Sequence, residues 1–320
     1  MVFRPADVRG TVGSMAMNNM PWALLDSSYN DRFQKLALHD VAVRQLTIRS
    51  AWNFRLFLER PEWFAYTTPG MFAMVGKRNP QTGRIAARPY SIVSAPHEDF
   101  LEFYIALTGE NLNELPPLSP EDPELGRLIR QYPYVSMLLQ DVVEREVEVN
   151  PTLNNVLLGQ ATLGSFRFDT TDRRAAVFGF TGTGVAAGVP VIRGYSWAPA
   201  VRRGIVFHGV RNPADFAYQD EFKEHRRQYP SFQYHMFLSR DAGTPWNYGS
   251  GRITTILAPR PDELKGEVHP FEKATGVPYD PDKIKLYLCG SDAMIRQVMD
   301  YAVRERGFDR KDIVHEKFFD

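Results

Sequence analysis

The order of hydrophobic and polar residues along the chain predicts two halves of different architecture. Up to about residue 168 the apolar stretches are short, and some alternate with polar residues, as in 42–48. Such alternation is typical of strands, and Pro69 with Gly70 marks a turn. Similar strand-like stretches are found at 90–94, 101–107, 156–158 and 164–168. Short strands separated by turns predict an antiparallel β-barrel.

After about residue 172 fully apolar runs alternate with loop or helical segments. A helix is expected to include residues 222–228. The apolar runs cover 175–180, 204–210, 234–238 and 284–289. Buried strands joined by crossover helices form parallel sheets. The expected fold is therefore a two-domain β + α/β protein, an antiparallel β-barrel followed by a parallel-sheet, Rossmann-like domain.

The length of 320 residues also favours two domains, because a single hydrophobic core rarely grows so large. We expect an N-terminal extension at 1–34, the barrel at 35–171 and the α/β domain at 172–320. An insert at about 109–155 interrupts the barrel. Its first part is rich in Pro, Glu and Asn and is expected to be a loop, whereas its second part mixes apolar and charged residues in a way that fits a helix.

The net charge points to no particular partner, and the cysteine count excludes several kinds of site. Lysine plus arginine equals aspartate plus glutamate at 38 each, so net charge gives no reason to expect a nucleic acid or an anionic membrane. The single cysteine, Cys289, excludes an intrachain disulfide, a four-cysteine iron–sulfur cluster and a cysteine-rich zinc site. We expect no metal. The chain shows no secretory segment and no apolar run that would span a bilayer, which predicts a cytoplasmic protein.

A glycine-rich turn directly follows the first apolar run of the second half. It comprises Thr181, Gly182, Thr183 and Gly184. Glycines there allow a ligand to approach the backbone, and a helix that begins after them would favour an anion. Such turns are common, and Gly188 is wrongly spaced for the usual dinucleotide fingerprint. The turn alone therefore leaves a nucleotide site and an ordinary loop about equally open.

The tetrapeptide Arg88, Pro89, Tyr90 and Ser91 combines groups that suit a flavin nucleotide. Arginine pairs with phosphate, tyrosine covers an aromatic ring, and a serine hydroxyl bonds a ring nitrogen. Strand alternation would place Arg88 and Tyr90 on one face and Ser91 on the other. Taken alone, the tetrapeptide fits better with a plain barrel strand that has a surface arginine and a core tyrosine.

Two further features lie near the end of the chain. Cys289 ends the last apolar run, at the edge where parallel sheets bind ligands, although most free cysteines are simply buried. Phe318 and Phe319 follow Glu316 at the terminus. Terminal aromatics either close a core or cover a site.

In their order along the chain, these motifs resemble the ferredoxin–NADP reductase family, over roughly residues 35–319 and in its bacterial flavodoxin/ferredoxin form. The motifs that carry the resemblance are, in order, 69–70, 88–94, 101–104, 181–184, 208–211, 215–218, 239–240, 251–254 and 288–291. Each motif is modest, but the colinear set is specific. The resemblance implies FAD and NADP(H) as cofactors.

For FAD the resemblance implies contacts from Arg88, Pro89, Tyr90 and Ser91. Arg88 would pair with a phosphate, Tyr90 would stack on the isoalloxazine ring, and Ser91 would hydrogen-bond near its reactive nitrogen. Tyr104 would lie along the adenosine half. Either Phe318 or Phe319 would cover the other face of the flavin.

For NADP(H) the resemblance implies contacts at the ends of several strands. Ser239 and Arg240 would hold the 2′-phosphate, with Arg252 assisting. The remaining nucleotide contacts would come from Thr181, Gly182, Thr183, Arg211, Ser291, Asp292 and Ala293. The residues expected to act in catalysis are Ser91, Cys289, which would border the nicotinamide, and Glu316, which would handle protons.

The expected function is hydride transfer between NADPH and FAD, with electrons passing to or from ferredoxin or flavodoxin. Arginine pairs such as Arg173–Arg174 and Arg226–Arg227 would form a docking face for an acidic carrier, or are solvated surface charge. One alternative is an NAD(P)H-dependent reductase component of an oxygenase, or a flavin or quinone reductase. Another is a non-catalytic nucleotide-binding subunit in which the insert binds a partner.

Overall fold

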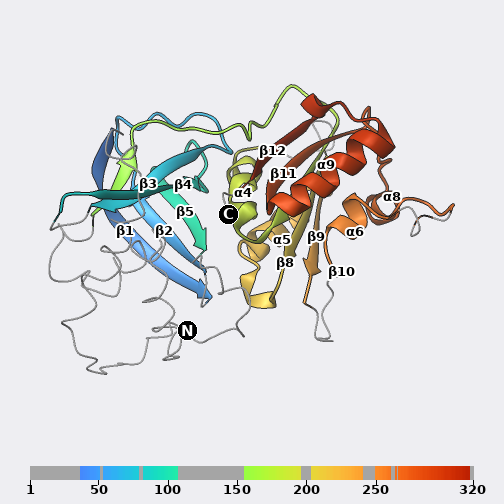
Figure 1. Cartoon of the computed structure of the whole chain (residues 1–320), viewed down its shortest axis with the longest axis horizontal. Coiled ribbons are helices and arrows are strands. Elements are labelled where there is room, and N and C mark those ends of the chain that lie inside the picture. The colour runs from blue at the N-terminus through green and yellow to red at the C-terminus, as the bar shows by residue number, and fades with distance from the viewer. Residues whose placement is uncertain are drawn as a thin grey trace.

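The computed structural model describes two sheets that lie side by side (Figure 1). The described residues are 37–50, 53–78, 82–106, 155–195, 203–240, 249–260, 264 and 266–317. The predicted extension at 1–34, the insert as far as residue 154, and both Phe318 and Phe319 lie outside these ranges. The division at residue 171 falls between the last strand of one sheet and the first of the other; the domain limits themselves stay a prediction.

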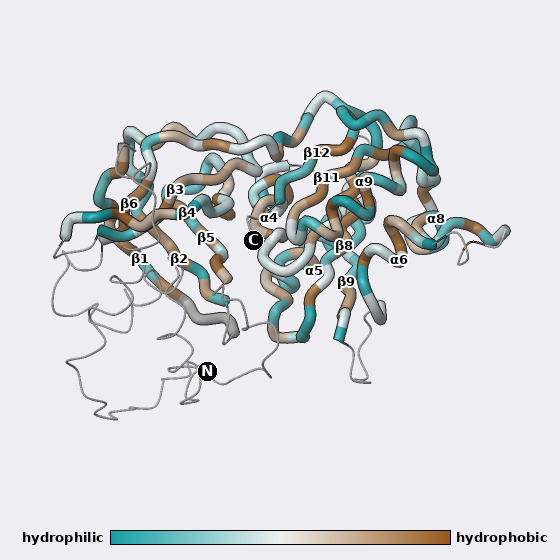
Figure 2. The backbone as a smooth tube through the Cα atoms, in the orientation of Figure 1, coloured by the Kyte–Doolittle hydropathy of each residue, from teal (hydrophilic) through white to brown (hydrophobic). Residues whose placement is uncertain are grey.

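The first sheet has six antiparallel strands in the order β4-β3-β6-β1-β2-β5. Along β2, Phe54, Leu56 and Leu58 are buried while the intervening side chains are more exposed, as strand periodicity requires. Hydrophobic residues recur along the strands of both sheets (Figure 2). The strands are β1 (Leu38–Ser50), β2 (Asn53–Glu59), β3 (Phe72–Arg78), β4 (Ile85–Ser91), β5 (Phe100–Ala106) and β6 (Asn155–Gly159).

The two edge strands of this sheet approach each other. Ile92, directly after β4, forms a β-bridge with Phe103 of β5. The Val93 N–H then donates to the Glu102 carbonyl oxygen at 2.7 Å. These contacts bring the edges together around one apolar core, which confirms the predicted antiparallel barrel.

The second sheet is parallel, with the order β10-β9-β8-β7-β11-β12. The central strands β7, β8 and β11 are almost wholly buried, which explains their continuous apolar sequences. The strands are β7 (Ala175–Thr181), β8 (Gly204–Val210), β9 (Phe232–Leu238), β10 (Gly249–Ser250), β11 (Ile284–Gly290) and β12 (Ile313–Lys317). The predicted Rossmann-like architecture is confirmed.

Helices cover both faces of the parallel sheet. The face toward the barrel packs against α4 (Val185–Gly194) and α5 (Gln219–Gln228), while α6 (Thr254–Leu257), α8 (Pro270–Thr275) and α9 (Asp292–Arg306) cover the other (Figure 1). Single 3-10 turns are η3 (Gly182–Gly184), η4 (Pro213–Asp215) and η5 (Arg310–Asp312). The result places α4 between the two sheets.

The stretch 164–168, expected to be a strand, is not one. Only the preceding Leu163 forms a bridge, with Phe72. The apolar residues instead pack across to the parallel sheet, where the Phe166 ring lies 6.0 Å from that of Tyr287 and the Phe168 ring 6.0 Å from that of Phe178. The apolar residues alternate with polar ones here because they pack against the parallel sheet, and not because the segment pairs with a neighbouring strand.

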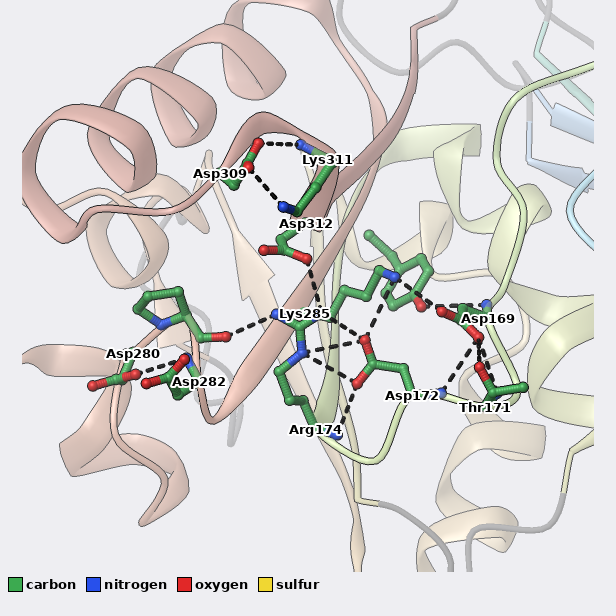
Figure 3. Close-up of polar contacts among 12 residues, drawn as sticks. Asp169, Thr171, Asp172, Arg174, Asp280, Asp282, Lys285, Asp309, Lys311 and Asp312 are labelled. Carbon is green, nitrogen blue, oxygen red and sulfur yellow. Dashed lines mark hydrogen bonds and ion pairs between the residues drawn. The ribbon is translucent and has the colours of Figure 1, made fainter.

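The segment that connects the sheets is anchored by charge (Figure 3). Arg174 donates to both Asp172 and Asp312, the latter at 2.8 Å. Lys285 Nζ lies 3.5 Å from Asp172 Oδ2 and 3.3 Å from Asp169 Oδ2. These pairs fasten the connecting segment to β11 and to the turn before β12, at the amino edge of the parallel sheet.

Within the described ranges no helix is long and apolar enough to cross a membrane. The same residues include no group of three or more His, Cys, Asp or Glu side chains that could hold a metal ion.

Candidate active site between the two sheets

The glycine turn occupies the point where the strand order of the parallel sheet reverses. From β7 the chain moves to β8 on one side, and later to β11 on the other. Crossovers that leave in opposite directions open a space at the carboxyl ends of these strands, where α/β proteins bind ligands. Thr181 ends β7, and η3 with Gly182, Thr183 and Gly184 follows at once. The topology therefore puts the predicted turn where a nucleotide would bind.

Close packing holds this turn against the end of β11. The Ser291 N–H donates to Thr181 Oγ1 at 2.9 Å. A Cβ on Gly184 would overlap the Cys289 carbonyl oxygen and lie 2.8 Å from Gly290 Cα, so only glycine fits there. Gly182 has φ +54°, and a Cβ on it would meet no described atom within 4 Å. The Gly182 backbone is thus open to a ligand while Gly184 fixes the turn from below.

Ser291 and Asp292 begin α9. The Ser291 side chain caps this helix by accepting from the Met294 N–H at 3.4 Å. Asp292 is ion-paired with Arg296, and Lys317 Nζ lies 3.8 Å from its carboxylate. Ala293 is exposed. The helix start beside the glycine turn is therefore ordered by its own cap, and its acidic residue is already partnered.

Three arginines predicted for the nucleotide lie close enough to affect one another. Arg211 follows β8, Arg240 follows β9, and Arg252 follows β10. Burial, then the charges of Arg240 and Arg252, lower the pKa of Arg211, and Asp215 offsets this only in part. Ser239 lies in the same place and donates its hydroxyl to the Val210 carbonyl oxygen at 3.2 Å. Mutually repelling guanidinium groups would be stabilised by an anion.

The predicted flavin motif lies on β4, the edge strand nearest β5. Arg88 is exposed, Pro89 and Tyr90 are half-buried, and Tyr90 packs on the barrel core. Ser91 is 5% exposed, and its hydroxyl has no hydrogen-bond partner among the described residues. A buried unpaired hydroxyl costs about 1–3 kcal/mol. An edge of a ring that offers a hydrogen-bonding nitrogen would remove this cost.

Cys289 and Glu316 are direct register partners on β11 and β12. Burial raises the pKa of the Cys289 thiol well above its ordinary value, and the Glu316 charge adds to this. Burial also raises the pKa of Glu316 to about 7. The Ser165 N–H lies 3.4 Å from Glu316 Oε2. The pair is therefore a neutral thiol beside a carboxyl that can hold a proton near neutral pH.

Phe72 and the adjacent residues Leu163 and Gly164 lie between Ser91 and Glu316. Ser91 pairs with Phe72 across β4 and β3, and Phe72 bridges to Leu163. A Cβ placed on Gly164 would lie 2.9 Å from Glu316 Oε2 and 3.1 Å from the Phe72 ring. The structure thus brings Ser91 of the barrel, and Cys289 and Glu316 of the parallel sheet, into one neighbourhood.

Tyr104, which was expected to contact the adenosine half of FAD, is buried. It is 4% exposed, and its ring packs edge-to-face on Tyr218 at 5.7 Å. It belongs to the apolar cluster between the sheets. Little of its surface is left for an adenosine to touch. The terminal Phe318 and Phe319 lie outside the described residues.

Comparisons with known proteins agree with this architecture. Residues 180–300 match the family described as Oxidoreductase NAD-binding domain. A flavodoxin/ferredoxin–NADP reductase of Buchnera aphidicola subsp. Baizongia pistaciae is 22% identical over 246 residues, which is 76% of this chain and 82% of that protein. Ferredoxin–NADP reductase B of Sorangium cellulosum is 30% identical over 155 residues, 48% of this chain and 59% of that protein.

A solved structure extends the match to both sheets. The ferredoxin NADP+ reductase from Neisseria gonorrhoeae, with bound FAD and NADP, superposes with a TM-score of 0.62 at 17% identity. The match covers 88% of this chain and 99% of that one. The chain therefore shares the fold of this reductase, and its residues 180–300 match an oxidoreductase NAD-binding domain.

A set of charged residues between the sheets was not predicted from the sequence. Glu102 is fully buried and accepts hydrogen bonds from Arg55, Arg193 and Tyr218, at 2.5, 2.9 and 2.7 Å. The available signal was the carboxylate of Glu102 within the apolar strand 101–107. A charge in such a strand requires a buried partner, although nothing local indicates that the partner is Arg193.

His208 begins the motif at 208–211, but no role was predicted for it from the sequence. It is fully buried on β8, and its Nδ1 lies 3.2 Å from the Tyr234 hydroxyl. Burial lowers its pKa to about 4, so it is neutral at physiological pH. It packs beneath the glycine turn, in register with Phe180.

Proposed function

We propose that this protein is an FAD-dependent oxidoreductase that passes hydride between NADPH and flavin, and exchanges electrons with ferredoxin or flavodoxin. One observation carries the proposal. The unpartnered, buried hydroxyl of Ser91 and the proton-holding carboxyl of Glu316 come from different sheets and lie on either side of Phe72 and Gly164. That arrangement suits a ring with a hydrogen-bonding nitrogen on one side and a nucleotide on the other.

On the flavin side, the motif of β4 offers the groups that a flavin nucleotide needs. Arg88 is exposed and would reach the diphosphate. Tyr90, half-buried on the barrel, would present its ring to the isoalloxazine. Ser91 would donate to a ring nitrogen, which would satisfy its hydroxyl. Proposed contacts of Phe318 or Phe319 with the other face remain predictions.

On the nicotinamide side, the carboxyl edge of the parallel sheet would hold NADPH. Thr181, Gly182 and Thr183 would contact the nicotinamide half, since the Gly182 backbone is open there. The cluster of Arg211, Arg240 and Arg252 supports a dinucleotide with an additional phosphate. Ser239 would share that phosphate, and the remaining contacts would come from Ser291, Asp292 and Ala293. A site of this charge discriminates NADPH from NADH.

When bound, FAD supplies the chemistry: it takes up two electrons from a nicotinamide and can pass them on singly. The chain's own residues bind, orient and supply protons. Ser91 fixes the ring edge, and Cys289, a neutral thiol, borders the nicotinamide without charge. Glu316, with a pKa of about 7, can release or take up a proton near neutral pH.

The proposed carrier follows from the names of the similar reductases. Of the arginines expected to dock it, Arg174 and Arg227 are taken up in ion pairs with Asp172 and Glu224. Docking by the arginine pairs therefore has less support than cofactor binding. A cytoplasmic location likewise remains a proposal.

An absorbance titration with NADPH tests the function. We expect a flavin band in the purified protein that bleaches with NADPH, and much less readily with NADH. Arg240→Ser should raise the KM for NADPH about 10- to 100-fold, because a hydrogen bond to a charged group contributes about 1.5–3 kcal/mol. Arg226→Ser, in the last turn of α5, is the matched control. It should change the KM for neither NADPH nor NADH.

A band that fails to bleach with either nucleotide would refute the proposal. Equal use of NADH and NADPH by the parent protein would refute the part that concerns the 2′-phosphate, and would favour a reductase of the NADH-dependent kind.

A further inference from the structure

Arg193 joins the end of α4 to the barrel. Its Nη1 donates to the Val93 carbonyl oxygen at 3.3 Å and to Glu102 Oε2 at 2.9 Å. Its Nε and Nη2 donate to both carboxylate oxygens of Glu221 on α5, at 2.7 and 3.0 Å. Glu98 Oε2 lies 3.4 Å away. One guanidinium thus contacts three carboxylates and one backbone carbonyl group.

The barrel residues that Arg193 contacts belong to the same stretch as the flavin motif. Val93 comes two residues after Ser91. The Val93 N–H donates to the Glu102 carbonyl oxygen at 2.7 Å, and the Glu102 N–H donates to Ser94 Oγ at 3.1 Å. Movement of Glu102 or Val93 would therefore be transmitted to Ser91.

The opposite end of α4 begins at the glycine turn. Gly184 precedes Val185, the first residue of the helix, and packs on Cys289. The ten residues of α4 make a rod about 15 Å long. The helix lies between the sheets (Figure 1), with the nicotinamide-side turn at one end and Arg193 at the other.

Glu102, the buried carboxylate that Arg193 contacts, is shared with two other donors. Glu102 also accepts from Arg55 of the barrel and from the hydroxyl of Tyr218, the residue before α5. Tyr218 is the one residue other than glycine with positive φ, 60°, among those described, and its ring lies against both guanidinium groups. The hydrogen bond from Arg55 and the charge of Arg193 outweigh burial and keep the pKa of Glu102 below its ordinary value.

We propose that Arg193 is a positioning residue for hydride transfer, because it sets the separation between the Ser91 stretch and the Thr181–Gly184 turn. This inference rests on the proposed function and adds a residue that contacts neither cofactor. A lysine at this position keeps one charge but cannot contact Glu221, Glu102 and Val93 together. The separation should then vary, while the nucleotide site itself stays intact.

The test compares Arg193→Lys with Arg174→Lys in the flavin-loaded protein. Arg174 is also a guanidinium shared by two carboxylates, but these are Asp172 and Asp312, and it anchors the connecting segment at the amino edge of the parallel sheet (Figure 3). We expect R193K to slow flavin reduction at saturating NADPH roughly 10- to 100-fold, because a misplacement of about 1 Å costs this much. The Kd for NADP+ should change less than about twofold, and R174K should reduce at the parent rate.

A second measurement needs no flavin. Hydrogen exchange of the apoprotein should show faster exchange of the Val93 and Glu102 amides in R193K than in R174K. If R193K does not fold, Glu221→Gln removes the bidentate partner alone and should shift both readouts in the same direction by a smaller amount.

Failure of the role proposed for Arg193 can be distinguished from failure of the proposed function. A flavin-loaded R193K that is reduced at the parent rate would overturn the inference alone. Equal slowing in R174K, or unchanged exchange at Val93 and Glu102, would make Arg193 merely structural and would also overturn it. A parent protein without a flavin would overturn the proposed function and the inference together.

Discussion

Cys289 and Glu316 lie opposite each other on β11 and β12, one residue before each strand ends. The thiol is fully buried, and the carboxyl is half-buried with its Oε2 3.4 Å from the Ser165 N–H. Burial raises the pKa of both groups, and a charge on Glu316 further disfavours the Cys289 thiolate, because the two anions would face each other across about one strand spacing. Both are therefore neutral over much of the pH range below 7.

Glu316→Gln should change how stability depends on pH. The pKa of Glu316 is about 7 in the folded protein, above its ordinary value of 4.5, so the folded state holds the extra proton between these values. The free energy of unfolding should consequently fall as pH rises through this window, by at most about 1.4 kcal/mol per pH unit and less where solvent reaches the carboxyl. E316Q should lack this contribution, as seen in urea midpoints between pH 5 and pH 7.5.

The exposed Glu305 on α9 provides the control for this measurement. E305Q should follow the parent pH dependence, so that the difference between the parent and E316Q belongs to the buried site. Identical pH dependence in the parent and E316Q would contradict the raised pKa.

Cys289 should resist alkylation in the folded protein. Burial raises its pKa well above the ordinary value, so little thiolate exists at pH 8, and the side chain is inaccessible. Iodoacetamide should leave intact protein unmodified over hours, while the urea-unfolded chain should gain one adduct by mass spectrometry. Rapid modification of the folded protein would place the thiol at an accessible surface and contradict its buried position.

Much of the fold could be predicted because its periodicities are local. Strands β7, β8 and β11 carry uninterrupted apolar runs since helices cover both faces, and Phe54, Leu56 and Leu58 alternate because only one face of β2 is buried. The same reasoning failed at 164–168. Alternation there arises from packing against the second sheet, which no local pattern distinguishes from a strand.

The site was predictable to the extent that it lies at strand ends. Parallel strands finish on one edge, so Thr181, Arg211 and Ser291 had to be neighbours once the sheet was recognised. The pairing of Glu102 with Arg193 was not predictable in this way. These residues are 91 positions apart, and only the assembled sheets bring them together.

Ser91→Ala should separate folding from chemistry. The mutation removes a buried hydroxyl that has no partner among the described residues, so the apoprotein should be unchanged or more stable by about 1 kcal/mol. Flavin reduction should slow at least about tenfold, because a donor at the reacting ring is lost. Thermal unfolding of the apoprotein and stopped-flow reduction of the holoprotein measure the two effects.

Ser94→Ala is the matched control for Ser91. Ser94 is also buried, but its hydroxyl accepts from the Glu102 N–H at 3.1 Å. Its loss should destabilise the apoprotein by about 1–3 kcal/mol, the opposite sign to Ser91→Ala. Destabilisation of the same size in both variants would show that the Ser91 hydroxyl has a partner within the protein.

Gly184→Ala should damage the nucleotide-side turn through packing alone. Its φ of −56° is acceptable for alanine, so the expected cost comes from the Cβ, which would overlap the Cys289 carbonyl and approach Gly290 Cα to 2.8 Å. Overpacking against backbone costs about 1–3 kcal/mol, and the displaced turn should weaken NADP+ binding as well. Gly194→Ala, at the other end of α4, would meet no described atom within 4 Å and should be neutral or slightly stabilising. Equal melting temperatures and equal NADP+ affinities for the two variants would mean that the turn does not depend on close contact between β7 and β11.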